Sequence, residues 1–439
     1  MANFAPPPGT ADIFPEEARR WRTVENTAAD VFSRYGYGEL RTPVFEYTEV
    51  FRRGLGGETE VVQKEMYTFE DRGGRSLTLR PEGTAGVMRA LSNTDVMNGV
   101  EQRVHYCGPM FRGERPAAGR RRQFHQIGVE NVGRCAPLLD AECIAMLMEF
   151  LREIGIPDAK LAVNTRGVMS DRGPAGKLLR DYFAARIDRM CPDCKARLER
   201  NVWRILDCKQ EECREIVADA PDYVAAFSEE SRTYFREVQE ALTALGVPFT
   251  VDPLLVRGLD YYVHTVFEVT HGGLGAQTAI AGGGRYELFL PGQSKPVPGV
   301  GFAAGVERLM LVRDALGLNT GYAAQTPFFL VGLGKEARLA NLRLADRLRR
   351  AGAAVALELE ERSFKAQLRS ANRCGAALTV VRGDDELRRG VAVVKRMDNG
   401  EQREIADSEL VERLLDFYRS GKFPAPDSCC NNRKDLETC

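Results

Sequence analysis

The sequence feature that most constrains the fold is segment 103–133, RVHYCGPMFRGERPAAGRRRQFHQIGVENVG, which predicts two strands joined by a loop. Residues alternate in character through both arms, as half-buried strands require, and a proline and a glycine interrupt the middle. Because strand side chains point alternately to opposite faces, one face of the second arm carries an amide, a position without a side chain and a carboxylate. The residues on that face are Phe124, Gln126, Gly128 and Glu130.

Several arginines surround this loop. The first arm carries Arg112, and the loop itself contains Arg115, Arg120, Arg121 and Arg122. This layout suits an anionic ligand near the arginines and a small polar ligand over Gly128. From the period alone, an edge hairpin whose arginines face solvent explains the pattern equally well.

The block FRGERP…GRRRQFHQIGVE in this hairpin resembles motif 2 of the class II aminoacyl-tRNA synthetases. Within that class it is most similar to the ATP and histidine hairpin of the bacterial histidyl-tRNA synthetase family. Further blocks resemble the same family in order: TLRPEGTAG, VRGLDYYVHTVFEV, IAGGGRYELF and PVPGVGFAAGVERLMLVRDAL. The resemblance reaches about Gly421, and such an ordered set is far more specific than any single block.

This resemblance implies a mixed α/β (α+β) fold. Residues 1–325 would form a class II catalytic core on an antiparallel sheet, containing a helical insertion domain at about 167–253. Strand and helix patterns then alternate through 326–421, which resembles the family's α/β anticodon-binding domain. The polar segment 422–439 lacks periodicity and is expected to be disordered.

The resemblance also implies a histidine-binding site. Glu82 and Gln126 would hold the amino group, while Glu130 and a tyrosine hydroxyl would pair the two ring nitrogens. From the residues alone, Glu82 could instead be an acid favoured by the dipole of the helix that follows, which Thr84 is expected to cap. The full histidine-binding set is Glu82, Gly83, Thr84, Arg112, Gln126, Glu130, Arg257, Tyr261, Tyr262 and Tyr286.

An ATP site is implied beside it, because the planar guanidinium of arginine suits phosphate oxygens. In the reaction that the resemblance implies, the histidine carboxylate attacks the α-phosphate, giving histidyl-adenylate and pyrophosphate. The histidine then passes to the 3′ end of tRNA(His). Arg257 is the predicted catalytic residue, and Mg²⁺ would bridge phosphates. The predicted ATP-binding residues are Arg112, Arg120, Arg122, Phe124 and Arg308.

The insertion contains the cysteine-rich stretch CPDCKARLERNVWRILDCKQEEC. Its cysteines permit a four-cysteine zinc site, although the second pair is loosely spaced. Reduced cysteines packed as small apolar residues explain them as well. Zinc is not a general feature of the family, so both readings stay open for Cys191, Cys194, Cys208 and Cys213.

Composition and charge bear on how the protein would hold tRNA and on where it works. The formal net charge of −1 gives no global basic field, so tRNA would be held by local patches. No apolar run is long enough for a membrane span, and the N-terminal segment lacks the pattern of a signal peptide. We therefore expect a cytoplasmic protein without disulfides. The family habit predicts a homodimer through segment 16–51.

Two other functions are alternatives to that of a ligase. The histidine-binding regulatory paralogue of ATP phosphoribosyltransferase shares the catalytic fold but usually lacks the anticodon domain and parts of the signature blocks. A stand-alone RNA-binding protein would leave Glu82, Gln126 and Glu130 unexplained. Gly113, Ala117 and Ala118 depart from the family pattern, which leaves open how the acceptor end of the tRNA is read.

Overall fold

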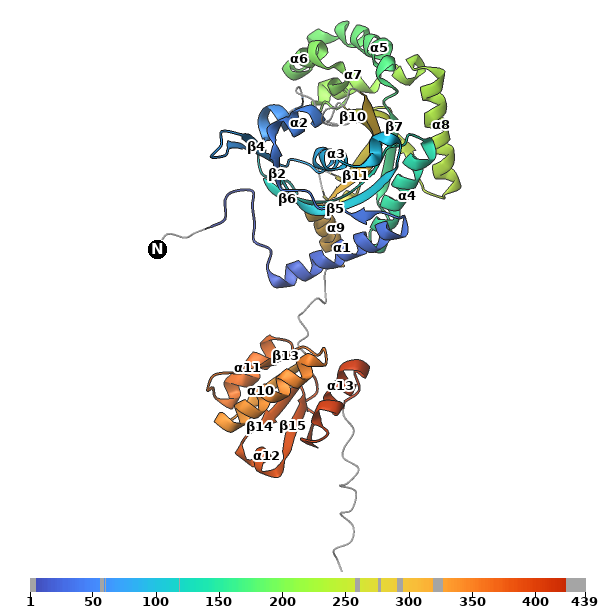
Figure 1. The fold of residues 1–439 in the computed structure, drawn as a ribbon. Coiled ribbons are helices and arrows are strands. Elements are labelled where there is room, and N and C mark those ends of the chain that lie inside the picture. The colour runs from blue at the N-terminus through green and yellow to red at the C-terminus, as the bar shows by residue number, and fades with distance from the viewer. Residues whose placement is uncertain are drawn as a thin grey trace, which may run out of the picture. The chain divides into compact units, whose positions relative to one another are not determined.

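The structure, a computed structural model, describes residues 5–55, 59, 61–117, 119–256, 261–274, 278–289, 295–318 and 327–423. The chain divides into two compact units, Met1–Thr320 and Gly321–Cys439 (Figure 1). We describe each unit by itself.

The first unit is built on an eight-stranded sheet in the order β1-β5-β6-β11-β10-β9-β7-β8. Its inner six strands pair antiparallel, and only the short edge strands β1 and β8 pair parallel. The predicted hairpin is confirmed, with Tyr106 opposite Gly128 and Val104 opposite Glu130. The strands are β1 (Gly38–Glu39), β5 (Gln102–Phe111), β6 (Gln123–Val132), β7 (Lys160–Thr165), β8 (Thr250–Val251), β9 (Tyr262–Thr270), β10 (Ala279–Phe289) and β11 (Pro296–Gly305).

The two faces of this sheet pack against different elements. Ile127 and Val129 of β6 face a large apolar core with residues from α1 (Pro15–Arg34), α4 (Pro137–Glu153), α8 (Glu229–Ala244) and α9 (Val306–Ala315). Tyr106, Val132 and Tyr286 belong to a separate core with α3 (Thr84–Leu91) on the other side. The alternation seen in the sequence thus separates the face that carries Ile127 and Val129 from the face that carries Gln126 and Glu130.

A three-stranded sheet in the order β2-β4-β3 lies in the same unit. The turn at Gly73 and Gly74 joins β3 to β4. The sequence of 36–51 predicts a turn followed by an extended chain, and that prediction is wrong at its end, because helix α2 begins at Thr48. Its charges suit a helix, with Glu49 paired to Arg53 one turn later. The elements are β2 (Phe45–Tyr47), α2 (Thr48–Leu55), η1 (Val61–Glu65), β3 (Thr68–Glu70), β4 (Ser76–Leu79) and η2 (Asp95–Asn98).

Between β7 and α8 the described chain is helical, as the sequence predicts. This stretch buries a core of its own, which includes Phe183, Trp203 and Tyr223. Its elements are η3 (Met169–Asp171), α5 (Arg172–Ala184), η4 (Ile187–Arg189), α6 (Pro192–Arg200), η5 (Val202–Ile205), α7 (Glu211–Ala218) and η6 (Tyr223–Ala226).

The second unit contains a five-stranded sheet in the order β13-β12-β14-β15-β16. The charged strand β16, which the sequence pattern did not predict, pairs antiparallel with β15. The sequence GLNTGYAAQTP predicts a linker at 317–327, and its residues 319–326 lie outside the described residues, as does the tail beyond residue 423 that is predicted to be disordered. The elements are β12 (Phe328–Gly332), α10 (Lys335–Arg350), β13 (Val355–Leu357), α11 (Phe364–Arg373), β14 (Leu378–Arg382), α12 (Asp384–Arg389), β15 (Val391–Arg396), β16 (Gln402–Ala406) and α13 (Leu410–Ser420).

The sequence predicts no membrane-spanning helix. Within the described ranges, no helix is both long and apolar enough to cross a bilayer.

Candidate active site

Glu130 on β6 is the centre of the candidate site. Its side chain is 2 % exposed, and both carboxyl oxygens accept hydrogen bonds from other elements. The Thr84 hydroxyl donates to Oε1 at 2.6 Å, and the Tyr286 hydroxyl donates to Oε2 at 2.7 Å. Burial raises the pKa of Glu130 to about 8, although both hydrogen bonds oppose the shift. A carboxyl group held so firmly can recognise a small polar ligand.

Glycines on the neighbouring strand β11 make room for these side chains. A Cβ at Gly301 would lie 2.2 Å from Oε2 of Glu130, and one at Gly299 would lie 2.4 Å from the Tyr286 ring. Both positions therefore require glycine. The sequence carries the signal as alternate glycines in PVPGVGFA, which we had interpreted only as a glycine-rich strand.

Glu82 is buried at the start of α3 and accepts backbone N–H groups at both oxygens. The N–H of Thr84 lies 2.7 Å from Oε2, and the N–H of Ala85 lies 2.8 Å from Oε1. Our prediction that Thr84 caps this helix was wrong, since Glu82 does so and the Thr84 hydroxyl turns to Glu130. Burial raises the pKa of Glu82, against the effect of these hydrogen bonds.

Tyr106 fills the space where we expected a ligand over Gly128. A Cβ at Gly128 would lie 2.4 Å from Cζ of Tyr106, and one at Gly83 would lie 2.2 Å from the same atom. The expectation of a ligand directly over Gly128 was therefore wrong. Oε1 of Gln126, one step along the same face, is buried and has no hydrogen-bond partner among the described residues. It is an acceptor available to a ligand.

Three tyrosines gather beside Glu130. The ring of Tyr261 lies 4.7 Å from that of Tyr262 and 5.8 Å from that of Tyr286, measured between centroids. Tyr286 is the one that reaches the Glu130 carboxyl group. The aromatic rings thus enclose one side of the polar face.

The arginines lie near the hairpin loop and are less buried. Nε of Arg112 donates to the Pro81 carbonyl oxygen at 2.9 Å, and its guanidinium carbon lies 5.3 Å from the Phe124 ring centroid. Arg308 on α9 donates to the carbonyl oxygens of Gly119 and Ala279. Burial and the nearby Arg120 lower the pKa of Arg308, which is typical of a site that gathers positive charge.

Two of the loop arginines contact Glu114. Arg120 is 43 % exposed and pairs with Glu114 at 3.2 Å, while Nε of Arg122 donates to the Glu114 carbonyl oxygen. Arg257, predicted to be catalytic, and Ala118 of the loop lie outside the described residues. Gly113 donates its N–H to the Glu65 carbonyl oxygen, which places it against η1.

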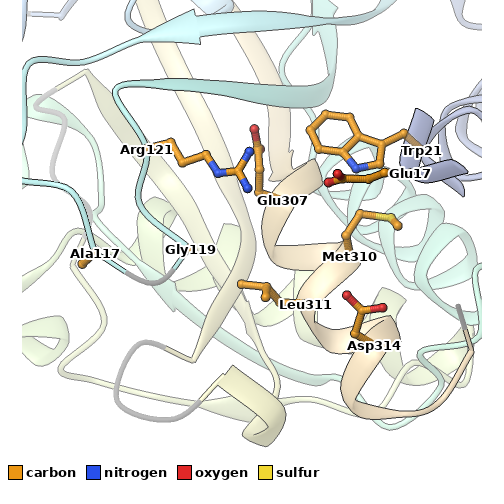
Figure 2. Close-up of a pocket in the computed structure, with 9 residues that line it drawn as sticks. All are labelled: Glu17, Trp21, Ala117, Gly119, Arg121, Glu307, Met310, Leu311 and Asp314. Carbon is orange, nitrogen blue, oxygen red and sulfur yellow. The ribbon is translucent and has the colours of Figure 1, made fainter. Parts of the chain in front are cut away.

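A cavity of about 420 Å³ opens between α1, the hairpin loop and α9 (Figure 2). In Figure 2 the Arg121 side chain extends toward Glu307, which also accepts the backbone N–H of His125. None of the predicted histidine-binding or ATP-binding residues lines this cavity, but Gly119 in its lining accepts a hydrogen bond from Arg308. Its lining residues are Glu17, Trp21, Ala117, Gly119, Arg121, Glu307, Met310, Leu311 and Asp314.

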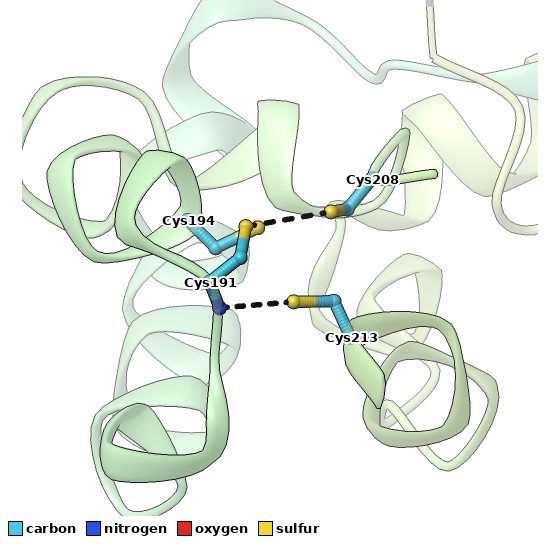
Figure 3. A group of neighbouring side chains, drawn as sticks. All are labelled: Cys191, Cys194, Cys208 and Cys213. Atoms are coloured by element: carbon cyan, nitrogen blue, oxygen red, sulfur yellow. Dashed lines mark hydrogen bonds between the residues drawn. The ribbon is translucent and has the colours of Figure 1, made fainter. Parts of the chain in front are cut away.

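The structure also brings the predicted cysteines of the helical segment together (Figure 3). The four sulfur atoms of Cys191, Cys194, Cys208 and Cys213 all lie within 4.8 Å of one another. This cluster belongs to the core of the helical segment, which is distinct from the core of the active-site face.

Comparison with known proteins gives the family. Residues 9–309 match the histidyl-tRNA synthetase family, and residues 328–417 match the anticodon binding domain. The histidine–tRNA ligase of Halothermothrix orenii is 46 % identical over 410 residues, covering 93 % of this chain and 98 % of that protein. The histidine–tRNA ligase of Geobacillus sp. WCH70 is 45 % identical over 416 residues, covering 94 % and 98 %.

A solved structure agrees with these relatives. The crystal structure of apo histidyl-tRNA synthetase from S. aureus is 36 % identical with a TM-score of 0.77, covering 93 % of this chain and 99 % of that chain. The anticodon-domain match and the near full-length similarity do not favour the regulatory paralogue. The chain is an aminoacyl-tRNA synthetase with a catalytic core and a C-terminal anticodon-binding domain, and it belongs to the histidyl-tRNA synthetase family.

Proposed function

We propose that the face around Glu130 binds L-histidine as the amino-acid substrate of a histidine–tRNA ligase. The observation that carries this proposal is the buried carboxyl group of Glu130, held on both oxygens by Thr84 and Tyr286. In the proposed complex Glu130 accepts one imidazole N–H, and a hydroxyl of Tyr261 or Tyr262 pairs with the other ring nitrogen. A site built on such polar contacts rejects analogues that lack them by large factors.

The amino group of histidine would lie between Gln126 and Glu82. Oε1 of Gln126 is buried and unpaired among the described residues, so it can accept a hydrogen bond from an ammonium group. Glu82 already accepts two backbone N–H groups, but its oxygens retain further lone pairs. Gly83 and Thr84 contribute by placing Glu82 at the helix entrance.

We propose that ATP lies toward Arg112, Phe124 and Arg308. Their guanidinium groups would neutralise phosphate charge, which is most of what such a transfer needs. Arg120 and Arg122 would act from the loop. Mg²⁺ would enter with ATP and supply further neutralisation of the phosphate charge.

Arg257 is proposed to act on the α-phosphate during adenylate formation. This assignment rests on the family resemblance of VRGLDYYV, since residues 257–260 lie outside the described ranges. Tyr261, the next described residue, belongs to the tyrosine group beside Glu130. The Arg257→His variant should therefore slow single-turnover adenylate formation with near-normal histidine binding. Equal loss of stability and histidine affinity, with a normal rate at saturation, would contradict the assignment.

The direct test of the proposed function is histidine-dependent exchange of pyrophosphate into ATP. We expect exchange with L-histidine and none with amino acids that lack an imidazole. Transfer to tRNA(His) then tests the second step. A protein that binds histidine but neither exchanges pyrophosphate nor charges tRNA would refute the proposed activity.

The domain assignment follows the same resemblance. We propose a catalytic core at 1–325, an insertion at about 167–253 near the acceptor arm of the tRNA, an anticodon-binding domain at 326–421 and a tail at 422–439. We also propose that the protein works in the cytoplasm. Deleting residues 326–439 should therefore impair tRNA charging far more than pyrophosphate exchange.

We propose a homodimer that includes the outer face of the sheet β2-β4-β3. Phe45, Tyr47 and Phe69 on this face are 47 %, 53 % and 44 % exposed, and the rings of Phe45 and Phe69 lie 6.3 Å apart. An exposed aromatic patch is typical of a surface that a partner covers, and a two-fold dimer needs only one such patch. Light scattering should give twice the chain mass, falling to one chain in Tyr47→Asp. A fully active monomer at micromolar concentration would rule the dimer out.

A further inference from the structure

The cysteine cluster of the helical segment is built like a metal site. Figure 3 shows the four side chains converging from α6, α7 and the chain after η5. All of the sulfur atoms lie within 4.8 Å of one another, and Sγ of Cys191 lies 3.9 Å from Sγ of Cys208. A tetrahedral ion with Zn–S bonds of about 2.3 Å would place its sulfur ligands about 3.8 Å apart. The cluster therefore needs little rearrangement to hold one ion.

The distances favour a single ion over an iron–sulfur cluster. The thiolates of such a cluster are distributed over two or more iron atoms, which separates some of the sulfur ligands further than a single shared ion does. Side chains limited to sulfur also favour a soft cation such as Zn²⁺ over Mg²⁺ or Ca²⁺. Four protein ligands fill the tetrahedron and leave no position for water, which is the form of a structural site.

The surrounding backbone supports negatively charged sulfur. Cys191 is the residue before α6, Cys194 lies in the first turn of that helix, and Cys213 lies in the first turn of α7. Helix N-termini favour thiolates because their backbone N–H groups carry partial positive charge. The backbone N–H of Cys191 also donates to Sγ of Cys213 at 3.2 Å. Such N–H···S bonds are the outer contacts that orient metal ligands.

A metal would add stability to the small core of the helical segment. This core is separate from the large core of the sheet, and its buried residues are drawn from 175–227. A single core of this size supplies only a few kcal/mol of stability, and a structural metal is one of the ways in which small cores gain more. Cys194, Cys208 and Cys213 are buried inside this core, and Cys191 lies at its edge. A metal there would tie α6, η5 and α7 together.

From this geometry we propose that Cys191, Cys194, Cys208 and Cys213 bind one structural Zn²⁺ ion that stabilises the helical segment. The proposal does not depend on the assignment of the histidine or ATP sites. Its readouts are metal content, a metal spectrum and local stability, so its failure is distinguishable from failure of the proposed ligase activity.

The test uses the full chain, purified under reducing conditions. We expect about one zinc per chain by elemental analysis, and cobalt substitution should give the visible and charge-transfer bands of tetrahedral thiolate coordination. Cys191→Ser and Cys208→Ser should each lower the metal affinity tenfold or more. They should also speed proteolytic cleavage within 185–227. The matched controls Cys135→Ser and Cys374→Ser, whose thiols lie outside the cluster, should behave like the wild type.

Two results would overturn the proposal. One is wild-type protein that carries no zinc after reconstitution and gives no cobalt–thiolate bands, which would show the cysteines to be packed as reduced thiols. The other is a variant that folds, lacks a cluster cysteine and still binds zinc as the controls do. Because the first result is measured on the wild type, it holds even if a variant fails to fold.

Discussion

At the histidine end of the candidate site, both oxygens of Glu130 are taken by side chains from other elements, and the group is almost fully buried. At the ATP end, Arg112 and Arg308 are half-buried, and the hydrogen bonds described for them go to backbone carbonyl oxygens. The first end has fixed side-chain geometry, whereas the second gathers positive charge on side chains that are only half-buried. The difference matches what each end must bind.

A neutral imidazole is distinguished by a few directional hydrogen bonds, which a dry and rigid wall provides. ATP carries several negative charges and arrives with a cation, so a partly hydrated group of arginines suits it better. Substrate selection and charge neutralisation can therefore be separated along one hairpin. Substitutions at each end should reveal that separation.

Glu130→Ala should lower histidine-dependent pyrophosphate exchange by about 10³-fold or more, because the imidazole loses its partner and the buried Thr84 and Tyr286 hydroxyls lose theirs. ATP binding, measured by calorimetry without histidine, should change little. Exchange near the wild-type level in a folded variant would show that Glu130 does not select the substrate.

Glu130→Gln is the matched control for folding. It keeps the volume and removes the group whose pKa burial raises to about 8. Since this folded-state pKa lies above the unfolded value of about 4.3, the wild type loses stability as the pH rises from about 4 to about 8. The variant should not show that loss, so its thermal midpoint should match or exceed the wild type at pH 8 while exchange remains impaired.

Arg308→Ala should slow adenylate formation by about 10²-fold, the typical cost of losing one charge that stabilises a phosphoryl transition state. Histidine affinity should stay within a few-fold, because Arg308 lies at the ATP end. Arg121→Ala is the control, since Arg121 belongs to the hairpin loop that Arg308 contacts through the Gly119 carbonyl oxygen, but it lines the cavity of Figure 2. If both variants slow the reaction equally, the arginines act through the structure of the hairpin loop and the comparison fails.

The affinity for histidine should change by about tenfold with pH, because the ionisable group Glu130 lies at the histidine end of the site. Above pH 6.5 or so free imidazole is neutral, while Glu130 keeps its proton up to its pKa of about 8. If Glu130 must ionise to accept the imidazole N–H, histidine affinity rises between these pH values by up to about tenfold per unit. Glu130→Gln should flatten this profile. An affinity that falls with pH would mean that histidine binds as the cation.

The sequence alone was sufficient for much of the fold, for reasons visible in particular residues. The alternation through Gln126 and Glu130 placed both on one face of the second strand, and the structure confirms it. Periodicity assigns a residue to a face, but it does not say which distant residue meets it. The pair Tyr286–Glu130 spans 156 positions, and Thr84–Glu130 spans 46. Neither partner could be found from spacing.

The largest omission concerns a buried ion pair. Arg285 and Asp140 are both 0 % exposed, and the two charges lie 2.5 Å apart across the core of the first unit. Each residue looks like an ordinary surface charge in the sequence. Only the structure, in which Asp140 of α4 meets Arg285 of β10, shows that they pair, and pairing is what makes their burial tolerable.

The smallest effect is expected at Arg120, at the outer limit of the ATP end. This residue is 43 % exposed and already pairs with Glu114. Solvent therefore screens its charge, and the Glu114 carboxylate partly offsets its attraction for phosphate. Arg120→Ala should therefore weaken ATP binding by no more than about threefold, the effect of an exposed charge worth under about 1 kcal/mol.

The Glu114→Gln variant separates two reasons for so small an effect. If pairing with Glu114 limits Arg120, removing the carboxylate should tighten ATP binding when Arg120 is present and not when it is absent. If ATP recruits Arg120 into a closed loop, Arg120→Ala should instead cost as much as Arg308→Ala, and the contrast between a rigid histidine end and a hydrated ATP end would have to be abandoned.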